Sequence, residues 1–104
     1  MEKRKPHYPL SRVKELIRQG SYRVTRTALL CATRDFGFVE ASQLAGCILN
    51  LEIKDFYKSM TTYHDSTLWQ DVYHARVQGS QAYVKLQITG DSTVVISFKR
   101  LEES

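Results

Sequence analysis

The stretch SQAYVKLQITGDSTVVISFKR, residues 80–100, decides the fold of this chain. Strict alternation of apolar and polar side chains is typical of a strand that rests one face on a core. The proposed core face carries Ala82, Val84, Leu86, Ile88, Val94, Ile96 and Phe98, and the opposite face carries Tyr83, Lys85, Gln87, Thr89 and Lys99. Because GDS at 90–92 is typical of a turn, the stretch predicts an antiparallel hairpin.

The register of this hairpin follows from its two apolar faces, which must coincide. A three-residue tip centred on Asp91 meets that condition, and it pairs Val84 with Phe98 and Tyr83 with Lys99. A two-residue tip would oppose Tyr83 to Phe98 and place a core face in solvent. We therefore predict that Tyr83 and Lys99 are neighbours on the polar face, with Cβ atoms roughly 5 Å apart.

The preceding strand is predicted within TLWQDVYHARV, residues 67–77. Its more apolar face carries Trp69, Tyr73, Ala75 and Val77, and its other face carries Gln70, Val72, His74 and Arg76. Gly79-Ser80 predicts a type II′ turn, which places Gln70 on the same face as Tyr83. That register separates the two along the strand by about six residues, roughly 20 Å, and a wider loop at 74–79 would shorten the separation.

The first half of the chain shows helical spacing of its apolar residues. A first helix opens at Pro9 and Leu10 and stops at Gly20, with an apolar stripe of Leu10, Val13, Leu16 and Ile17. After a short extended link at 22–24, Thr25 is expected to cap a second helix that closes near Gly37, and a third helix is expected over 41–49. Helices followed by strands predict an α+β fold, an antiparallel sheet with the N-terminal helices packed against it.

Length and composition predict one globular domain, residues 1–104, since 104 residues are too few for two cores. No apolar run approaches the roughly 20 residues of a membrane span. The charged start MEKRKPHYPL lacks the apolar region of a signal peptide. We therefore expect a cytoplasmic protein without a membrane partner.

Charge is distributed unevenly along the chain. Residues 1–34 hold nine Lys/Arg against two acids, a net +7, whereas residues 35–104 carry a net −3. A basic N-terminal third suits a polyanion. A set of solvated helix faces explains the same charges equally well.

Several kinds of chemistry lack a signature in this sequence. Cys31 and Cys47 lie among apolar neighbours and are expected to be reduced core residues. His7, His64 and His74 show no metal-ligand spacing and are expected at the surface. There is no GxSxG motif of a nucleophilic serine and no glycine-rich phosphate loop. From the histidine spacing and the missing phosphate loop we expect no metal and no cofactor.

Aromatic and polar side chains concentrate in DFYKSMTTYHDSTLWQDVY, residues 55–73. Tyrosine rings beside lysines suit single-stranded nucleic acid, because bases stack on rings and cations meet phosphates. RNA brings its own nucleophile, the 2′-OH, so cleavage needs only a proton acceptor, a proton donor and cations for the developing charge. A merely solvated sheet face remains the alternative.

The sequence strongly resembles the MqsR family, the motility quorum-sensing regulator toxins of bacterial toxin–antitoxin pairs. The segments that carry the resemblance occur in the family's order and cover nearly the whole chain: EKRKPH (2–7), TRTALL (25–30), DFYKSMTTY (55–63), WQDVY (69–73), YVKL (83–86) and ISFK (96–99). The pairing of DFYKSMTTY with WQDVY is the most specific of these features.

The resemblance implies a RelE-like fold and an endoribonuclease that cuts single-stranded mRNA without a metal, a cofactor or the ribosome. It also implies a cognate MqsA-like antitoxin with a zinc-bearing half and a DNA-binding helix-turn-helix half. The family's catalytic residues map onto Lys58, Gln70, Tyr83 and Lys99, and the expected RNA contacts are Tyr57, Met60, Lys85 and Arg100. A non-catalytic nucleic-acid-binding module and a toxin that poisons a protein target are the alternatives.

Overall fold

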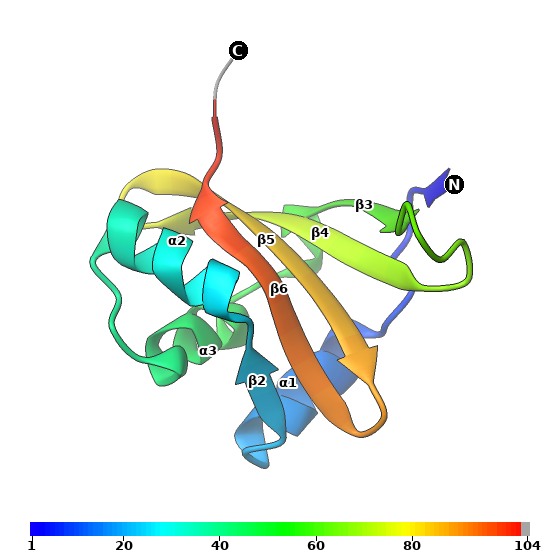
Figure 1. Cartoon of the computed structure of the whole chain (residues 1–104), viewed down its shortest axis with the longest axis horizontal. Coiled ribbons are helices and arrows are strands. Elements are labelled where there is room, and N and C mark those ends of the chain that lie inside the picture. Colours follow the sequence, from blue (N-terminus) through cyan, green and yellow to red (C-terminus); the bar gives the residue numbers. More distant parts are fainter. Residues whose placement is uncertain (103–104) are drawn as a thin grey trace.

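The computed structural model describes residues 1–102. Three helices, α1 (Leu10–Arg18), α2 (Arg26–Phe36) and α3 (Ala41–Leu49), precede most of the sheet, and a 3₁₀ turn, η1 (Ile53–Asp55), leads into it. The strands are β1 (Glu2–Lys3), β2 (Tyr22–Val24), β3 (Phe56–Thr61), β4 (Trp69–Val77), β5 (Ser80–Thr89) and β6 (Ser92–Arg100). Figure 1 shows the long β5–β6 hairpin crossing the molecule, and the predicted α+β class is confirmed.

The sheet has six strands in the order β1-β3-β4-β5-β6-β2. The central pairs are antiparallel, as predicted, but β2 pairs with β6 in parallel. The expectation of a purely antiparallel sheet was therefore wrong. The segment 22–24, expected as a link, forms an edge strand, and the N-terminal residues Glu2 and Lys3 form the other edge beside β3.

The three predicted helices are confirmed, and local chemistry sets their ends. Thr25 Oγ1 accepts a hydrogen bond from the Ala28 N–H at 3.1 Å and caps α2, and Gly37 closes that helix at a φ of 73°. The predicted stripe of α1 is buried: Leu10, Val13, Leu16 and Ile17. Within residues 1–102, none of the helices is long and apolar enough to cross a membrane.

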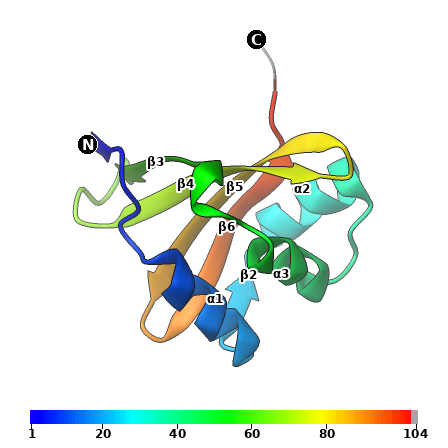
Figure 2. The same ribbon diagram turned by 180° about the vertical axis from the view of Figure 1, so that it is seen from behind.

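The core lies between the helices and one face of β4, β5 and β6. Figure 2 shows α1 and α3 beneath that face. The helices contribute Val13, Ala32, Leu44 and Ile48, and the strands contribute Tyr73, Ala75, Val84, Leu86, Val95 and Phe98. Cys31 and Cys47 are unpaired, as expected, and both are partly buried. Cys47 packs against the core, whereas Cys31 lies outside the core cluster, so the prediction was wrong for Cys31.

The β5–β6 hairpin pairs Tyr83 with Lys99 and Val84 with Phe98, as predicted. Its tip, however, has two residues rather than three, since Thr89 pairs with Ser92. A bulge at Ile96 restores the predicted pairing beyond it, because Leu86 pairs with Val95 while Lys85 pairs with Ser97. The bulge also changes the core face, which receives Val95 where the alternation indicated Val94 and Ile96.

The β4–β5 turn also differs from the prediction. Its tip is Gln78-Gly79, one residue earlier than expected, and both residues have positive φ, 53° and 77°. This arrangement is typical of a type I′ turn rather than type II′. His74 consequently lies opposite Tyr83, so Gln70 is only four residues along β4 from that row, about 13 Å.

Candidate RNA-binding face

The open face of the sheet, away from the helices, carries a row of aromatic side chains. His74 on β4 lies opposite Tyr83 on β5, which lies opposite Lys99 on β6. The Tyr57 ring of β3 stacks on His74 with centroids 4.2 Å apart, and His74 is 6.2 Å from the Tyr83 ring. Tyr57 remains 44% exposed, so its free ring face can receive a base.

A bulge in β3 explains how Tyr57 and Lys58 reach the same face. Phe56 pairs with Tyr73, whereas Lys58 pairs with Val72, so Tyr57 is the additional residue. Phe56 packs its ring against Tyr73 on the core side, with centroids 5.5 Å apart. A bulge re-aims side chains locally, and here two consecutive residues of the FYKSM segment point away from the core.

Three lysines surround Tyr83. The ammonium groups of Lys85 and Lys99 lie 5.9 and 5.4 Å from its ring centroid, and the ammonium of Lys58 is close enough to lower its pKa by charge. Lys58 lies 5.5 Å from the Tyr57 ring. Three cations around one phenol form a site suited to a phosphate group and to charge that develops on it.

Burial sets the protonation states at this site. Desolvation raises the pKa of the Tyr83 phenol, and the nearby Lys58 charge opposes that shift without reversing it. Tyr83 therefore holds its proton at neutral pH. Desolvation lowers the pKa of Lys85, and repulsion from Lys99 and Lys58 adds to that effect. Burial of the His74 ring lowers its pKa, which keeps the ring neutral at pH 7.

Gln70 lies in the next part of the same face. It pairs with Met60 of β3, and its side-chain amide Nε2 donates to Oε1 of Gln87 at 2.8 Å. Gln87 in turn donates to Thr89 Oγ1 at 2.7 Å. Gln70 is buried, and this chain of hydrogen bonds fixes its side-chain orientation.

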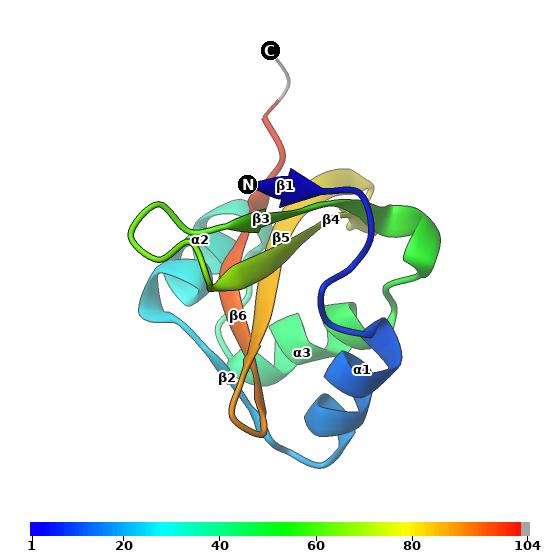
Figure 3. The same cartoon turned by 90° about the vertical axis from the view of Figure 1, so that its right-hand side faces the viewer.

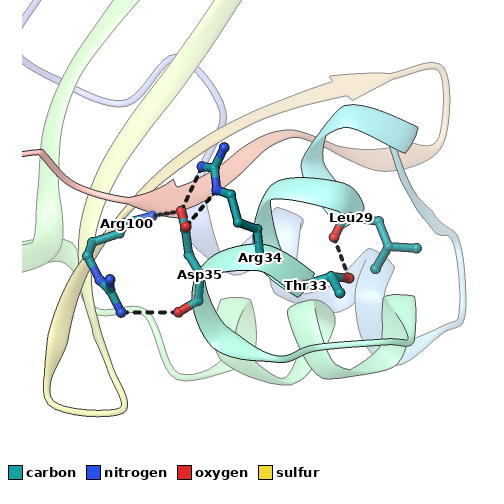
Figure 4. A network of polar contacts seen from close by, with 5 residues as sticks. All are labelled: Leu29, Thr33, Arg34, Asp35 and Arg100. Atoms are coloured by element: carbon teal, nitrogen blue, oxygen red, sulfur yellow. Dashed lines mark hydrogen bonds and ion pairs between the residues drawn. The ribbon is translucent and has the colours of Figure 1, made fainter.

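Arg100 does not join the other predicted site residues. It lies opposite the buried Ala82, on the helix side of the sheet, and Figure 4 shows it facing the end of α2. Its backbone N–H donates to Asp35 Oδ2 at 2.9 Å and its guanidinium donates to the Asp35 carbonyl at 3.2 Å. The structure thus brings together seven of the eight predicted residues: Tyr57, Lys58, Met60, Gln70, Tyr83, Lys85 and Lys99.

Two groups at this face were not among the predicted site residues. His74 was expected as a surface residue, yet it is half-buried between two tyrosines, whereas His7 and His64 are exposed as expected. Glu2 forms an ion pair with Lys58, with 2.6 Å between Nζ and Oε1. The only sequence signal for Glu2 was its place in the EKRKPH segment.

Among residues 1–102, no three His, Cys, Asp or Glu side chains gather to hold a metal ion.

Fold and face together define a small α+β protein, and the tyrosines and lysines of its open face suit single-stranded nucleic acid. Comparison with known proteins gives the family. The family described as "Motility quorum-sensing regulator, toxin of MqsA" matches residues 5–100. The mRNA interferase toxin MqsR of Escherichia coli (strain K12) is 46% identical over 99 residues, which cover 95% of this chain and 98% of that protein. The chain belongs to the MqsR toxin family.

Proposed function

We propose that this chain is the toxin of a toxin–antitoxin pair and an endoribonuclease that cleaves single-stranded mRNA, without a metal and without the ribosome. The relative from Escherichia coli is an mRNA interferase by name, and the shared family supports the same activity here. The structural observation that carries the proposal is the convergence of three lysines on the protonated phenol of Tyr83. The proposed reaction uses these side chains and the RNA's own 2′-OH.

The proposed reaction is attack of a ribose 2′-OH on the adjacent phosphorus. Lys58 and Lys99 hold the phosphate and stabilise the charge that builds up on its oxygens, and Lys85 adds to the positive potential. Tyr83 gives its proton to the departing 5′-oxygen, since its raised pKa keeps it protonated. The products are a 2′,3′-cyclic phosphate and a 5′-OH.

The remaining predicted residues bind the nucleotides on either side. Tyr57 and Met60 offer apolar surface to a base, and base–ring stacking contributes about 1–3 kcal/mol per base. Gln70, oriented by Gln87, presents an amide to a base or to the phosphate. Tyr57 lies at the row of His74, Tyr83 and Lys99, and Gln70 lies beyond Lys58 and Lys85 along the strands. An RNA strand that contacts both Tyr57 and Gln70 therefore passes over the lysines.

The family description names a toxin of MqsA, and we propose that the partner of this chain is a similar antitoxin. We expect that antitoxin to bind zinc in one half and DNA through a helix-turn-helix in the other. We further propose that residues 1–104 form one RelE-like toxin domain acting in the cytoplasm.

Purified protein mixed with an unstructured RNA in excess EDTA tests the proposal. We expect cleavage by the unmodified protein and strong loss with Lys58→Ala and with Tyr83→Phe. Uncut RNA, or cleavage that neither change affects, would contradict it. Salt-sensitive binding without products would favour a nucleic-acid-binding module, and intact RNA with a stoichiometric protein complex would favour a toxin that poisons a protein.

A further inference from the structure

The N-terminal strand β1 lies along the edge of the sheet beside β3, as Figure 3 shows. Glu2 pairs with Met60, which places it on the open face that also carries Lys58 and Gln70. From there its carboxylate reaches the Lys58 ammonium at 2.6 Å. A carboxylate therefore lies in direct contact with a lysine to which the proposed function assigns the phosphate.

Several contacts hold this short strand in place. The amino group of Met1 donates to Thr61 Oγ1 at 3.0 Å, and the Lys3 ammonium lies 4.3 Å from the centroid of the Trp69 ring. Beyond the strand, the buried Asp71 carboxylate accepts the backbone N–H groups of His7 and Tyr8 at 3.0 and 2.9 Å. The segment is anchored at both ends, so Glu2 is a positioned group rather than the side chain of a loose terminus.

We propose that Glu2 is the proton acceptor of the cleavage reaction, paired with Tyr83 as proton donor through the phosphate that Lys58 holds. This inference rests on the proposed ribonuclease activity. Lys58 interacts with both groups. Its ammonium donates a hydrogen bond to the Glu2 carboxylate, and its positive charge lowers the pKa of the Tyr83 phenol. A phosphate bound there has a carboxylate on the β1 side and a phenol on the β5 side.

The proton balance closes with these two groups. The Glu2 carboxylate takes the proton of the 2′-OH as that oxygen bonds to phosphorus. The bond between phosphorus and the 5′-oxygen breaks, and the departing oxygen takes the Tyr83 proton. Solvent then removes the proton from Glu2 and returns one to Tyr83. The two side chains end in their starting states, and the RNA has gained a cyclic phosphate and a 5′-OH.

Electrostatics keeps the two groups in the required states. The hydrogen bond from Lys58 and its charge lower the pKa of Glu2, and Arg4 and the Met1 amino group act in the same direction. These are the charged groups that face Glu2 from β3 and from its own segment. Glu2 is therefore ionised and Tyr83 protonated across the neutral range. The Glu2 side chain is 56% exposed, which leaves its carboxylate accessible to a bound ribose.

The alternative is that Glu2 only shields Lys58. In that case removing its charge would free the lysine, and RNA would bind more tightly and be cut at least as fast. A proton acceptor predicts the opposite for the cleavage step, because binding is kept or improved while kcat falls. Glu2→Gln separates the two readings, because the amide is nearly the same size and accepts no proton.

The test compares unmodified protein, Glu2→Gln, Tyr83→Phe and the surface control Glu15→Gln in single-turnover cleavage of a short RNA. A second substrate carries sulfur in place of the 5′-oxygen at the scissile bond, and this leaving group needs no proton donor. On the ordinary RNA we expect Glu2→Gln and Tyr83→Phe each to cleave about 10²- to 10³-fold more slowly than the unmodified protein. The sulfur substrate should restore Tyr83→Phe and leave Glu2→Gln slow, with Glu2→Asp partly active.

The outcomes are distinguishable. No cleavage by the unmodified protein would contradict the proposed function itself. Cleavage by Glu2→Gln at the unmodified rate, faster cleavage, or its recovery on the sulfur substrate would each overturn the assignment of Glu2 while leaving the ribonuclease activity standing. Circular dichroism of Glu2→Gln should match that of the unmodified protein.

Discussion

Tyr83 lies directly opposite Lys99 across the β5–β6 pair, and the Lys99 ammonium is 5.4 Å from the centroid of the Tyr83 ring. The phenol thereby belongs to the cationic face of the sheet, whereas Tyr73, on the neighbouring strand, belongs to the core. Two tyrosines of one sheet thus have opposite environments and should respond oppositely to loss of the hydroxyl.

Tyr83→Phe should reduce kcat for RNA cleavage by about 10²- to 10³-fold and change RNA affinity little, because the lost group is a proton donor. The matched control is Tyr73→Phe. The Tyr73 hydroxyl is buried without a hydrogen-bond partner in the part of the chain that the structure describes, so its removal should leave stability unchanged or raise it by up to about 1 kcal/mol. Equal loss of cleavage in both variants would refute this distinction.

Lys58→Ala and Lys99→Ala should weaken RNA binding and flatten its salt dependence. Each phosphate contact on a single strand contributes about 0.7 to the slope of log affinity against log salt, so each variant should lower the slope by roughly that amount. The control is Arg18→Ala at the end of α1, on the helix side of the molecule. Affinity measured by fluorescence anisotropy at several salt concentrations would decide, and an unchanged slope in both lysine variants would count against phosphate binding.

Gln87→Ala should impair cleavage although Gln87 itself is assigned no contact with RNA. Its Oε1 accepts the hydrogen bond that orients Gln70, and a lost bond of about 1.4 kcal/mol corresponds to a tenfold effect. The expected result is a roughly tenfold loss in kcat/KM, smaller than that of Gln70→Ala. Gln81→Ala, an exposed glutamine of the same strand, serves as control and should cleave normally.

Asp35 should stabilise the fold rather than contribute to cleavage. Hydrogen bonds from Arg34 and from the Arg100 backbone N–H hold the pKa of its carboxyl at about 2, below the ordinary 3.8. Because the folded-state pKa is the lower one, this stabilisation is complete above about pH 4 and disappears as the pH falls towards 2. Asp35→Ala should therefore melt at a lower temperature than the unmodified protein at pH 7, with a difference that vanishes in acid, while RNA cleavage stays near normal.

The contact between Arg100 and Asp35 also predicts a structural role for Arg100. Arg100 was expected among the RNA contacts, but it follows Lys99 in β6, and adjacent residues of a strand point to opposite faces. Lys99 faces the open side, and Arg100 faces α2. Arg100→Met should lower the melting temperature and leave the salt dependence of RNA binding unchanged, and a reduced slope would restore its predicted role.

Much of this arrangement was predictable because period-two alternation assigns side chains to faces regardless of register. Gln70, Tyr83, Lys85 and Lys99 were placed on one face by alternation alone, and the pairing of Tyr83 with Lys99 was correct. The three helices followed from apolar spacing and from Thr25 and Gly37 at the ends of α2. The family resemblance supplied the roles and Lys58.

The errors share a physical cause. Bulges at Tyr57 and Ile96 and the early tip at Gln78-Gly79 depend on local backbone conformation, which alternation does not encode. The early tip makes the observed distance from Gln70 to Tyr83 shorter than predicted. The bulge at Ile96 makes the core-facing residues of β6 differ from the predicted ones. The ion pair of Glu2 with Lys58 joins residues 56 positions apart through an edge strand of two residues, too short for any pattern to reveal.

The central claim, cleavage by the RNA's own 2′-OH, is tested most directly by a single substitution in the substrate. An unstructured RNA is cut by the protein in excess EDTA, its cleavage position and chain ends are mapped, and the same RNA is then made with 2′-deoxyribose on the 5′ side of that position. We expect a 2′,3′-cyclic phosphate and a 5′-OH from the first RNA and no cleavage of the second at that position. A 3′-OH with a 5′-phosphate, or unchanged cleavage of the deoxy-substituted RNA, would contradict the mechanism.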